Sequence, residues 1–379
     1  MILGVNGIRL VKDRSGVARC LEAMLGNLDA LEHPFTDIRI YTPTPLDAST
    51  YLPRGARNVV LPSRLPPGLW EQVTLPRGHG GRGLLLCPSY IQPLFPGAPT
   101  FLIHHGSYEG FPQAFDWWTL NKARVMYALS AWRATAVSTV SDFSRRDMER
   151  FYGIPAERVH MVPEGVDAAL FRPLAGRAPV DAWRRAALGA DVPFIVYVGK
   201  PTERRNLSAL IRAFAQLKRA STSGPAIPHK MLIVGADLPG TSPFREVIAE
   251  LGLGDEVVVK GHVTHEEMVL VYNGASCLVY PSSYEGFGMP VLEAMACGTP
   301  VIALDNTAFP EFAGGVAMLL PDAQVPTLAE GIRRVISDAA LRRQMAADGP
   351  RRAAAYDWRL VTQRYLDLMI PIARAEGSS

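Results

Sequence analysis

The stretch YEGFGMPVLEAMACGTPVIA, residues 284–303, decides the fold of this chain. Two short apolar runs flank its middle part, CLVYP at 277–281 and TPVIAL at 299–304. Both runs are rich in β-branched residues and bounded by Gly, Pro or Ser, which is typical of buried strands. Between them a glycine-rich turn leads to Pro290, which suits a first helical turn, and apolar residues continue to Gly298, a C-cap signal. The pattern predicts a strand, a glycine loop, a helix and a second strand.

The glycine loop and the helix after it predict an anion-binding site. Gly286 and Gly288 allow a tight turn and a close approach to a ligand, and a helix N-terminus offers N–H groups at its positive dipole end. Glu285 and Glu293 frame the loop with carboxylates that can accept hydrogen bonds from sugar hydroxyls. From these residues alone, the alternative is a helix N-terminal charge beside a solvated loop carboxylate, with no ligand.

Length and composition predict a two-domain globular protein. The chain has 379 residues, of which 48% are hydrophobic and 20% charged, and this length is large for a single core. The net charge of +3 is too small to indicate binding to nucleic acid. The N-terminus lacks the pattern of a signal peptide and no apolar run reaches 18 residues, so we expect a cytoplasmic protein. Contact with a membrane would then be peripheral, on its cytoplasmic face.

The four cysteines, at positions 20, 87, 277 and 297, are dispersed along the chain. They form no C-x-x-C pair and no regular ladder of spacings. The sequence therefore predicts neither a disulfide framework nor a zinc site, and a reducing compartment is the expected setting.

The first half of the chain alternates predicted strands with helices. Residues 2–6 predict a strand, and a loop at 7–16 then leads to a helix that begins near Val17, which is again a geometry suited to anions. The alternative for Gly16 is an ordinary turn between strand and helix. A helix follows at 117–133, where aromatic residues at helical spacing are expected in the core, with Trp117 or Trp118 stacking on a sugar as the alternative. Further strands are predicted at 37–41, 58–61, 84–87, 100–103 and 136–140.

The second half begins after a stretch rich in Pro, Ala and Arg. Residues 169–191 lack strand patterning and predict a linker between a domain at 1–168 and one at 192–356. The second domain opens with a strand at 194–198, and Lys200, Arg204 and Arg205 follow before the next helix. Cations at that position can neutralise a phosphate, although a basic surface turn is the alternative. The alternation in both halves predicts an α/β fold of two doubly wound, Rossmann-like domains that face a crevice.

Residues 284–302 closely resemble the E-x7-E region of the retaining nucleotide-sugar glycosyltransferases of family 4, which have the GT-B fold. The resemblance implies transfer of a sugar from a GDP- or UDP-sugar, with GDP-mannose slightly favoured, to a hydroxyl of a glycan or lipid-linked acceptor in polysaccharide biosynthesis. The chain has no Asp-x-Asp motif of the kind that holds a metal against a diphosphate. The expected enzyme is therefore independent of metal, needs no cofactor, and uses its nucleotide sugar as a co-substrate.

The resemblance also implies roles for individual residues. Glu285 would bind hydroxyls of the donor sugar and Glu293 those of the ribose. Arg205, with Arg204 or Lys200, would neutralise the diphosphate, and loss of such a cation would cost about two to three decades in rate. The full expected donor-binding set is Gly16, Lys200, Arg204, Arg205, Glu285, Gly286, Phe287, Gly288, Met289, Pro290, Val291 and Glu293.

A histidine pair follows the strand predicted at 100–103. The family often has Ile-His-Asp at this strand end, which aligns His104 with the family's histidine at the donor sugar and leaves His105 as the alternative in register. The expected catalytic residues are thus Glu285, His104 and Arg205. Four positions depart from the family pattern: Ser15 replaces a glycine, His105 an aspartate, Glu164 an asparagine and Arg205 a lysine. The resemblance further implies that a last helix, at about 357–379, packs back on the first domain.

Two other kinds of protein use the same architecture and stay open at this stage. A nucleotide-sugar epimerase would process its substrate without an acceptor, and a polysaccharide phosphorylase would need a pyridoxal lysine, for which the sequence has no motif. The third alternative is a non-catalytic protein that binds a nucleotide sugar. The presence of the expected phosphate-binding and carboxylate positions argues against this last alternative.

Overall fold

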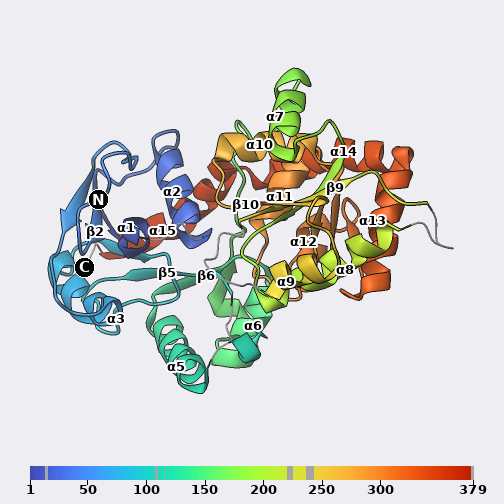
Figure 1. Cartoon of the computed structure of the whole chain (residues 1–379). Coiled ribbons are helices and arrows are strands. Elements are labelled where there is room, and N and C mark those ends of the chain that lie inside the picture. The colour runs from blue at the N-terminus through green and yellow to red at the C-terminus, as the bar shows by residue number, and fades with distance from the viewer. Residues whose placement is uncertain (13–15, 107–109, 115, 220–224, 236–242, 377–379) are drawn as a thin grey trace. The chain divides into compact units, whose positions relative to one another are not determined.

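The computed structural model describes residues 1–12, 16–106, 110–114, 116–219, 225–235 and 243–376 of the chain. The chain divides into two compact units (Figure 1). Unit 1 consists of Met1–Gly165 and Tyr356–Ser379, and unit 2 of Val166–Ala355. Each unit is an α/β structure built on a parallel sheet, as the alternation of predicted strands and helices requires.

Unit 1 contains a parallel sheet whose strands, in the described residues, lie in the order β3-β2-β1-β4-β5-β6-β7. Its central strands are apolar on both faces because helices cover both. The chain winds outward from β1 through β2 to one edge, and from β4 to the other, so the order reverses between β1 and β4. The strands are β1 (Ile2–Asn6), β2 (Asp37–Thr42), β3 (Ala56–Val60), β4 (Leu84–Cys87), β5 (Thr100–His104), β6 (Ala136–Thr139) and β7 (Val159–Met161).

The last helix of the chain belongs to unit 1. Helix α15 (Trp358–Glu376) lies beside α2 (Gly16–Leu28), as the red and blue ribbons of Figure 1 show. Buried apolar residues of both helices, among them Leu21 and Leu366, supply the packing surfaces. The other helices of unit 1 are α1 (Ile8–Lys12), α3 (Pro67–Leu69), the π-helix η1 (Trp70–Thr74), α4 (Leu75–His79), η3 (Pro112–Ala114), α5 (Trp117–Arg133), α6 (Asp142–Tyr152) and η4 (Ala156–Arg158).

Unit 2 contains a second parallel sheet, with the described strands in the order β10-β9-β8-β11-β12-β13. Its order reverses between β8 and β11, which pair directly. The strands are β8 (Phe194–Val198), β9 (Lys230–Val234), β10 (Val257–Lys260), β11 (Cys277–Tyr280), β12 (Val301–Leu304) and β13 (Met318–Leu320). The predicted strand, glycine loop, helix and strand at 277–304 are thus present as β11, α11 (Met289–Ala296) and β12.

A large apolar core lies between the sheet of unit 2 and its helices. Leu210 and Phe214 of α8 pack there with Ile332 and Val335 of α13. The helices of this unit are α7 (Ala178–Leu188), η5 (Glu203–Arg205), α8 (Leu207–Leu217), α9 (Pro243–Glu250), α10 (His265–Gly274), α12 (Phe309–Ala313), α13 (Val325–Ser337), α14 (Ala339–Ala353) and η6 (Ala354–Tyr356), besides α11.

The segment expected to be a linker, residues 169–191, is folded with unit 2. It contains α7, which packs against α10 through the buried Val180. The backbone N–H of Leu174 donates to Asn273 Oδ1 at 2.9 Å, and Arg177 donates to the Asn273 carbonyl oxygen at 2.8 Å. Residues 169–191 lack strand patterning because apolar residues such as Val180 and Leu188 recur there at helical rather than alternating spacing.

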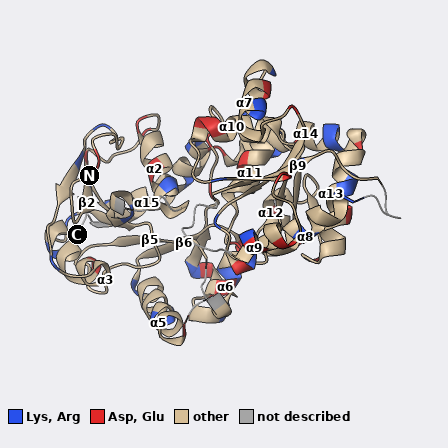
Figure 2. Ribbon diagram, viewed as in Figure 1, with Lys and Arg blue, Asp and Glu red and all other residues tan. Residues whose placement is uncertain are grey.

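Charged residues of both signs are interspersed over the two units (Figure 2). Among the described residues, no helix combines the length and the apolar character that crossing a membrane would need. Trp117 and Trp118, expected mainly in the core, are 65% and 76% exposed at the start of α5.

Candidate functional site

In unit 2 the loops after β8 and β11 meet where the strand order reverses. Ile195 pairs with Cys277 and Val196 with Leu278 in parallel register. The carboxyl ends of the two strands therefore lie side by side, and the loop 199–206 meets the loop 281–288. Open α/β sheets bind ligands at such a reversal.

A carboxylate and two guanidinium groups join the two loops. Glu285 Oε1 accepts from Arg204 Nη1 at 2.6 Å and from Arg205 Nε at 2.9 Å. The same oxygen also accepts from the Tyr280 hydroxyl at 2.9 Å and from Ser282 Oγ at 3.1 Å. Four donors thus converge on Oε1. None of these four donates to the other carboxylate oxygen, Oε2.

The charges of this cluster stay fixed at neutral pH. Burial alone would raise the pKa of Glu285, but the positive charges of Arg205 and Arg204 outweigh it and hold the pKa below its usual value. Burial tends to lower the pKa of Arg205, but the effects of Tyr280 and Glu285 outweigh burial and raise this pKa above its usual value. The guanidinium therefore stays charged. With the exposed Lys200, the two loops hold three cations against the two carboxylates Glu203 and Glu285, so they carry net positive charge.

Backbone geometry fixes how the two loops approach each other. Asn206 adopts a positive φ of 49°, which asparagine tolerates better than most residues. Its side-chain amide donates to the carbonyl oxygen of Pro281 at 2.8 Å and to Ser283 Oγ at 2.7 Å. The N–H of Ser283 in turn donates to the carbonyl oxygen of Arg204 at 2.7 Å. Arg204 also donates to the Tyr284 carbonyl oxygen, so both arginines are held by the opposite loop.

Helix α11 begins directly after this loop. Gly288 has a φ of 119°, and a Cβ there would lie 2.7 Å from Cε1 of Phe309, so the turn requires glycine. Phe287 is buried and stacks on Phe312 with ring centroids 4.5 Å apart. The expected donor contacts of residues 286–291 would therefore involve the backbone more than the buried side chains of Phe287 and Val291.

Glu293 lies further along α11 and is 4% exposed. Its Oε2 accepts from the Tyr272 hydroxyl of α10 at 3.0 Å. The carboxylate thus has a protein partner, and contact with a ribose would add to that bond or replace it.

In unit 1, α2 begins at Gly16, one residue before the predicted helix start near Val17. Ser15 lies outside the described residues, as do the Ser-Tyr-Glu residues at 107–109 that follow the histidine pair.

The side chain of His104 is in the core. It is 0% exposed, and its ring contacts Tyr90, Tyr127 and Tyr152 with centroid distances of 5.0, 5.6 and 5.4 Å. Neither ring nitrogen has a hydrogen-bond partner within the described residues. Burial lowers the pKa of His104 to about 3, so the ring is neutral. This placement does not present the imidazole to a ligand.

His105, the alternative in register, has polar partners. Its Nε2 lies 2.9 Å from the carbonyl oxygen of Pro88, and its Nδ1 lies 3.2 Å from Glu164 Oε1. Both side chains are mostly shielded, with 7% and 11% exposure. Two of the four positions where this chain departs from the family pattern, His105 and Glu164, are thus in contact with each other.

Glu71 is a candidate that sequence reasoning did not single out. It lies in the π-helix η1 and is 7% exposed. Its Oε1 accepts from Asn6 Nδ2 at 2.8 Å, at the carboxyl end of β1 where the strand order of unit 1 reverses. Burial raises its pKa to about 7, although Asn6 and Arg9 act in the opposite direction. The available signal was a glutamate directly after Trp70 in the segment LWEQVTL, and π-helical turns are frequent at functional sites.

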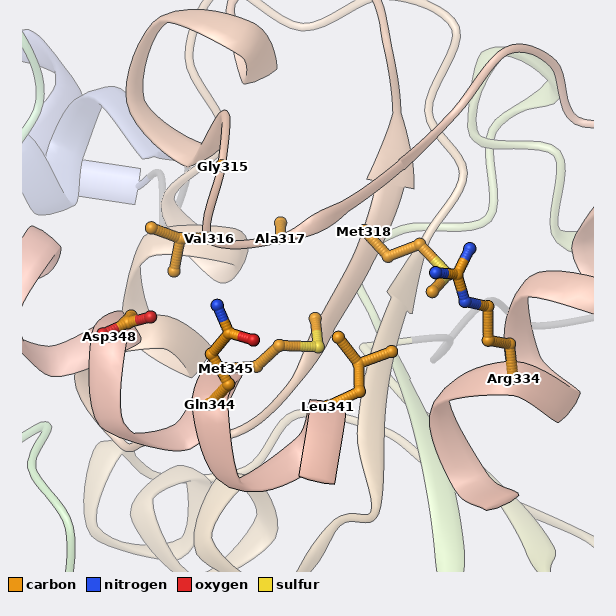
Figure 3. Close-up of a pocket in the computed structure, with 9 residues that line it drawn as sticks. All are labelled: Gly315, Val316, Ala317, Met318, Arg334, Leu341, Gln344, Met345 and Asp348. Atoms are coloured by element: carbon orange, nitrogen blue, oxygen red, sulfur yellow. The ribbon is translucent and has the colours of Figure 1, made fainter. Parts of the chain in front are cut away.

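A pocket in unit 2 lies at the other end of the sheet. Residues 315–317, which precede β13, form one side, and Leu341 and Met345 of α14 point into the space from the other (Figure 3). The site described above lies after the strand ends, whereas this pocket lies before a strand begins. It contains none of the expected site residues.

Two family profiles match adjoining parts of the chain. The profile "Glycosyltransferase Family 4" matches residues 14–170, and the profile "Glycosyl transferases group 1" matches residues 181–352. The boundary between the two matches falls close to the division between the two units of the structure.

Two curated relatives illustrate the similarity of sequence. The D-inositol 3-phosphate glycosyltransferase of Kineococcus radiotolerans is 30% identical over 241 residues, which are 60% of this chain and 55% of the relative. The MMP alpha-(1→4)-mannosyltransferase of Mycolicibacterium hassiacum is 32% identical over 227 residues, which are 59% of this chain and 51% of the relative. The chain therefore matches about half the length of each of these relatives.

Solved structures show the same fold along the whole chain. The sucrose-phosphate synthase of Thermosynechococcus elongatus superposes with a TM-score of 0.78 at 21% identity, covering 100% of both chains. Anabaena HepE in complex with UDP-glucose superposes with a TM-score of 0.74 at 19% identity, covering 100% of this chain and 99% of the other. At such identities the likeness concerns the fold. With both family profiles matched in order, this chain belongs to the group 1, family 4 glycosyltransferases and has the GT-B fold.

Proposed function

We propose that the protein is a retaining glycosyltransferase that moves a sugar from a nucleotide diphospho-sugar to a hydroxyl of a glycan or lipid-linked acceptor. The observation that supports this most is the cluster of Arg204, Arg205 and Glu285 at the strand-order reversal of unit 2. The cluster brings cations for a diphosphate next to a carboxylate for sugar hydroxyls. Membership of the family supports the same reaction.

In this proposal, stabilisation of the leaving diphosphate is the largest contribution of the protein. Arg205 and Arg204 are held in place by Glu285, so their remaining N–H groups are preorganised for phosphate oxygens. The N-terminus of α11 adds its dipole on the same side of the loop. Removing one preorganised donor typically lowers the rate by about 10²–10³-fold.

Glu285 would have two tasks in the reaction. Its Oε1 holds the arginines, and its Oε2 is the oxygen that would accept hydrogen bonds from the donor sugar. The departing phosphate would take the proton of the acceptor hydroxyl on the same face of the sugar, which preserves the anomeric configuration without a covalent intermediate. An inverted product, or a trapped glycosyl-enzyme adduct, would contradict this mechanism.

GDP-mannose is the first donor to test, and UDP-sugars are the second. A mannosyltransferase among the relatives supports the former. The structural neighbour that holds UDP-glucose supports the latter.

The deciding experiment measures donor binding without added metal. Thermal shift and calorimetric titration would compare GDP-, UDP-, ADP- and TDP-sugars, using the full chain and its Arg205→Ala variant. Arg212→Ala is the matched control, since Arg212 forms an exposed ion pair with Glu250 on the same unit, at 3.1 Å. We expect one nucleotide class to bind, Arg205→Ala to abolish the shift, and Arg212→Ala to leave it unchanged. Absence of a shift with every nucleotide, with and without Mg²⁺, would contradict the proposal.

Turnover separates the proposed transferase from an epimerase and from a non-catalytic binding protein. Incubation of the best donor without an acceptor would reveal an epimerase as a changed sugar. Incubation with a set of lipid-linked and free glycan acceptors would reveal a transferase, and proton NMR of the product would give its anomeric configuration. A donor that binds but never reacts would favour the non-catalytic alternative.

For the acceptor side, we propose peripheral contact with an anionic membrane through α5. Trp118, Val125, Leu129 and Trp132 follow helical spacing and are 76%, 57%, 42% and 48% exposed. Lys122 lies on the same stripe and Arg124 next to it, and both side chains are exposed. An apolar stripe with cations beside it suits a surface of anionic lipid.

Vesicle flotation tests this contact. We expect the chain to float with vesicles that contain phosphatidylglycerol and not with neutral ones. The double variant Trp118→Ser/Val125→Ser should stay in solution. If this variant floats with anionic vesicles as much as the unaltered protein does, α5 is not the membrane-binding surface.

A further inference from the structure

Three potential metal ligands converge in unit 1. Cys20 is on α2, His105 follows β5, and Glu164 follows β7. The Cys20 Sγ, a ring nitrogen of His105 and a carboxylate oxygen of Glu164 all lie within 4.8 Å of one another. Cys20 is buried and the other two side chains are largely shielded from solvent. A sulfur, a nitrogen and an oxygen atom that can each bind a metal ion thus lie close together.

The hydrogen bonding of His105 decides which nitrogen is available. Nε2 lies 2.9 Å from the carbonyl oxygen of Pro88, which can only accept, so Nε2 bears a proton. In a neutral imidazole, Nδ1 then offers a lone pair, and it lies 3.2 Å from an oxygen of Glu164. A lone pair facing a carboxylate is repulsive unless a positive charge lies between them. That charge is either a proton, shared by His105 and Glu164, or a metal ion.

The geometry suits a metal ion. Two ligands at about 2.0–2.1 Å from a tetrahedral zinc ion are about 3.3 Å apart, close to the separation of Nδ1 and Oε1 here. Histidines that bind metals usually donate their other N–H to a carbonyl or carboxylate, and Pro88 provides that partner. The thiolate of Cys20 would be the third ligand after a small movement of its side chain.

A pocket adjoins the three residues and leaves space beside them. Its wall includes Ile103, Trp358 and Tyr365, together with Cys20 and His105. Largely apolar walls lower the local dielectric and strengthen the attraction between a cation and its ligands. The space beside the cluster can take the fourth ligand, which in three-ligand zinc sites is a water or another small donor.

We propose that Cys20, His105 and Glu164 bind a divalent metal ion of the zinc type. The ion would tie α2 to the segments that follow β5 and β7, whereas the proposed transfer reaction is expected to need no metal. The spacing of the cysteines predicted no zinc site, because the three ligands come from segments far apart in the chain. The sequence departures at positions 105 and 164 supply two of the three ligands.

Metal titration of the full chain tests the proposal without any nucleotide sugar. Protein freed of metal by a chelator would be titrated with Zn²⁺ and with Co²⁺, whose spectrum reports a thiolate ligand through charge-transfer absorption. We expect about one equivalent to bind, a thiolate band with Co²⁺, and a rise in Tm with Zn²⁺. Failure of the unaltered protein to bind an equivalent of either ion would overturn the proposal.

Ligand variants give the second test. Cys20→Ser and Glu164→Gln should each weaken Zn²⁺ binding by about 100-fold or more, since changes of outer-shell partners alone cost up to that factor. Cys20→Ser should also abolish the thiolate band. Cys297→Ala, which removes a buried thiol of unit 2, is the matched control and should bind as the unaltered protein does.

Circular dichroism would confirm that each variant folds, and Glu164→Gln serves as the independent test if Cys20→Ser does not fold. A thiolate band that persists in Cys20→Ser would overturn the assignment, as would unchanged affinity in Glu164→Gln. The positive charge between His105 and Glu164 would then be a proton, and the two side chains an ordinary ion pair.

Discussion

The loops of unit 2 and the histidine pair of unit 1 both follow buried parallel strands, yet they end in different environments. After β8 and β11, Arg204, Arg205 and Glu285 bind one another near the surface. At the end of β5, His104 points into a group of tyrosines, and His105 contacts Pro88 and Glu164.

The difference lies in what fixes each side chain. Arg205 and Glu285 are loop residues whose opposite charges select their partners, so their placement follows from their identity. His104 is the last residue of a strand, and successive strand residues face opposite sides of the sheet. Leu102 packs in the core of unit 1, and His104, two residues later, shares its face. At the end of a strand, therefore, a shift of one residue in the sequence alignment decides whether a side chain is expected in the core or at a ligand.

The largest expected effect is that of Arg205→Ala. Loss of this guanidinium removes a fixed cation from the proposed diphosphate site and frees Glu285 from one partner. We expect kcat to fall by about 10²–10³-fold. Arg205→Lys sharpens the comparison, because it keeps the charge but loses the forked geometry, and should recover part of the rate. Steady-state kinetics with Arg212→Ala as the control would measure both, and equal rates for the three variants would remove the loop cluster from the mechanism.

Glu285→Gln should have the next largest effect. The amide keeps the shape of the side chain but loses the charge that holds both arginines, and hydrogen bonds to charged groups contribute about 1.5–3 kcal/mol. We expect kcat to fall by about tenfold to a hundredfold. Because the two cations remain but lose the charge that holds them, the affinity for the free nucleoside diphosphate should decrease less than in Arg205→Ala, and calorimetry would measure it. A parallel loss of nucleotide affinity would show that Glu285 organises the phosphate site more than it contacts the sugar.

The third prediction concerns Glu71, which lies where the strand order of unit 1 reverses. Burial raises its pKa to about 7 in the folded state, whereas in the unfolded chain the pKa is near 4.5. The folded state therefore binds more protons between these values, and stability decreases as the pH rises through this window, by roughly 3 kcal/mol at most.

Chemical denaturation at pH 4.5, 6 and 8 would measure this change in the free energy of unfolding. Glu71→Gln should flatten the profile, since the amide keeps the acceptor for Asn6 and has no charge to bury. An unchanged profile in the variant would assign the pH dependence to other groups. Glu22 of α2, a titratable residue that is exposed, gives the matched control Glu22→Gln.

The sequence was sufficient for the strongly patterned elements. The run from β11 to β12 was predictable because apolar strands, helix formers, a proline at the helix start and a glycine at its end all indicate the same structure. The cations after β8 were predictable as neighbours of Glu285, since parallel strands bring their loops to one edge of the sheet.

Other features depend on contacts that spacing does not encode. The helix α7 was not predicted because its sequence, rich in Arg and Ala, has few large apolar residues, and only two of its side chains, Val180 and Leu188, are buried. Only the tertiary fold brings together Cys20, His105 and Glu164, so no local sequence motif predicts their contact. The exposure of Trp118 likewise depends on which face of α5 the sheet covers.

The smallest expected effect is that of His104→Phe, and it tests the comparison most directly. In the structure this ring contacts aromatic side chains and makes no hydrogen bond within the described residues, so phenylalanine preserves its packing and removes two polar atoms from the core. We expect kcat within a few-fold of the unaltered protein and a Tm that is equal or higher. A loss of more than tenfold in kcat, with the Tm maintained, would show that His104 leaves the tyrosine cluster to reach the donor, as the family alignment implies. His104 would then be a catalytic residue, and its buried position would be one of two positions that its side chain occupies.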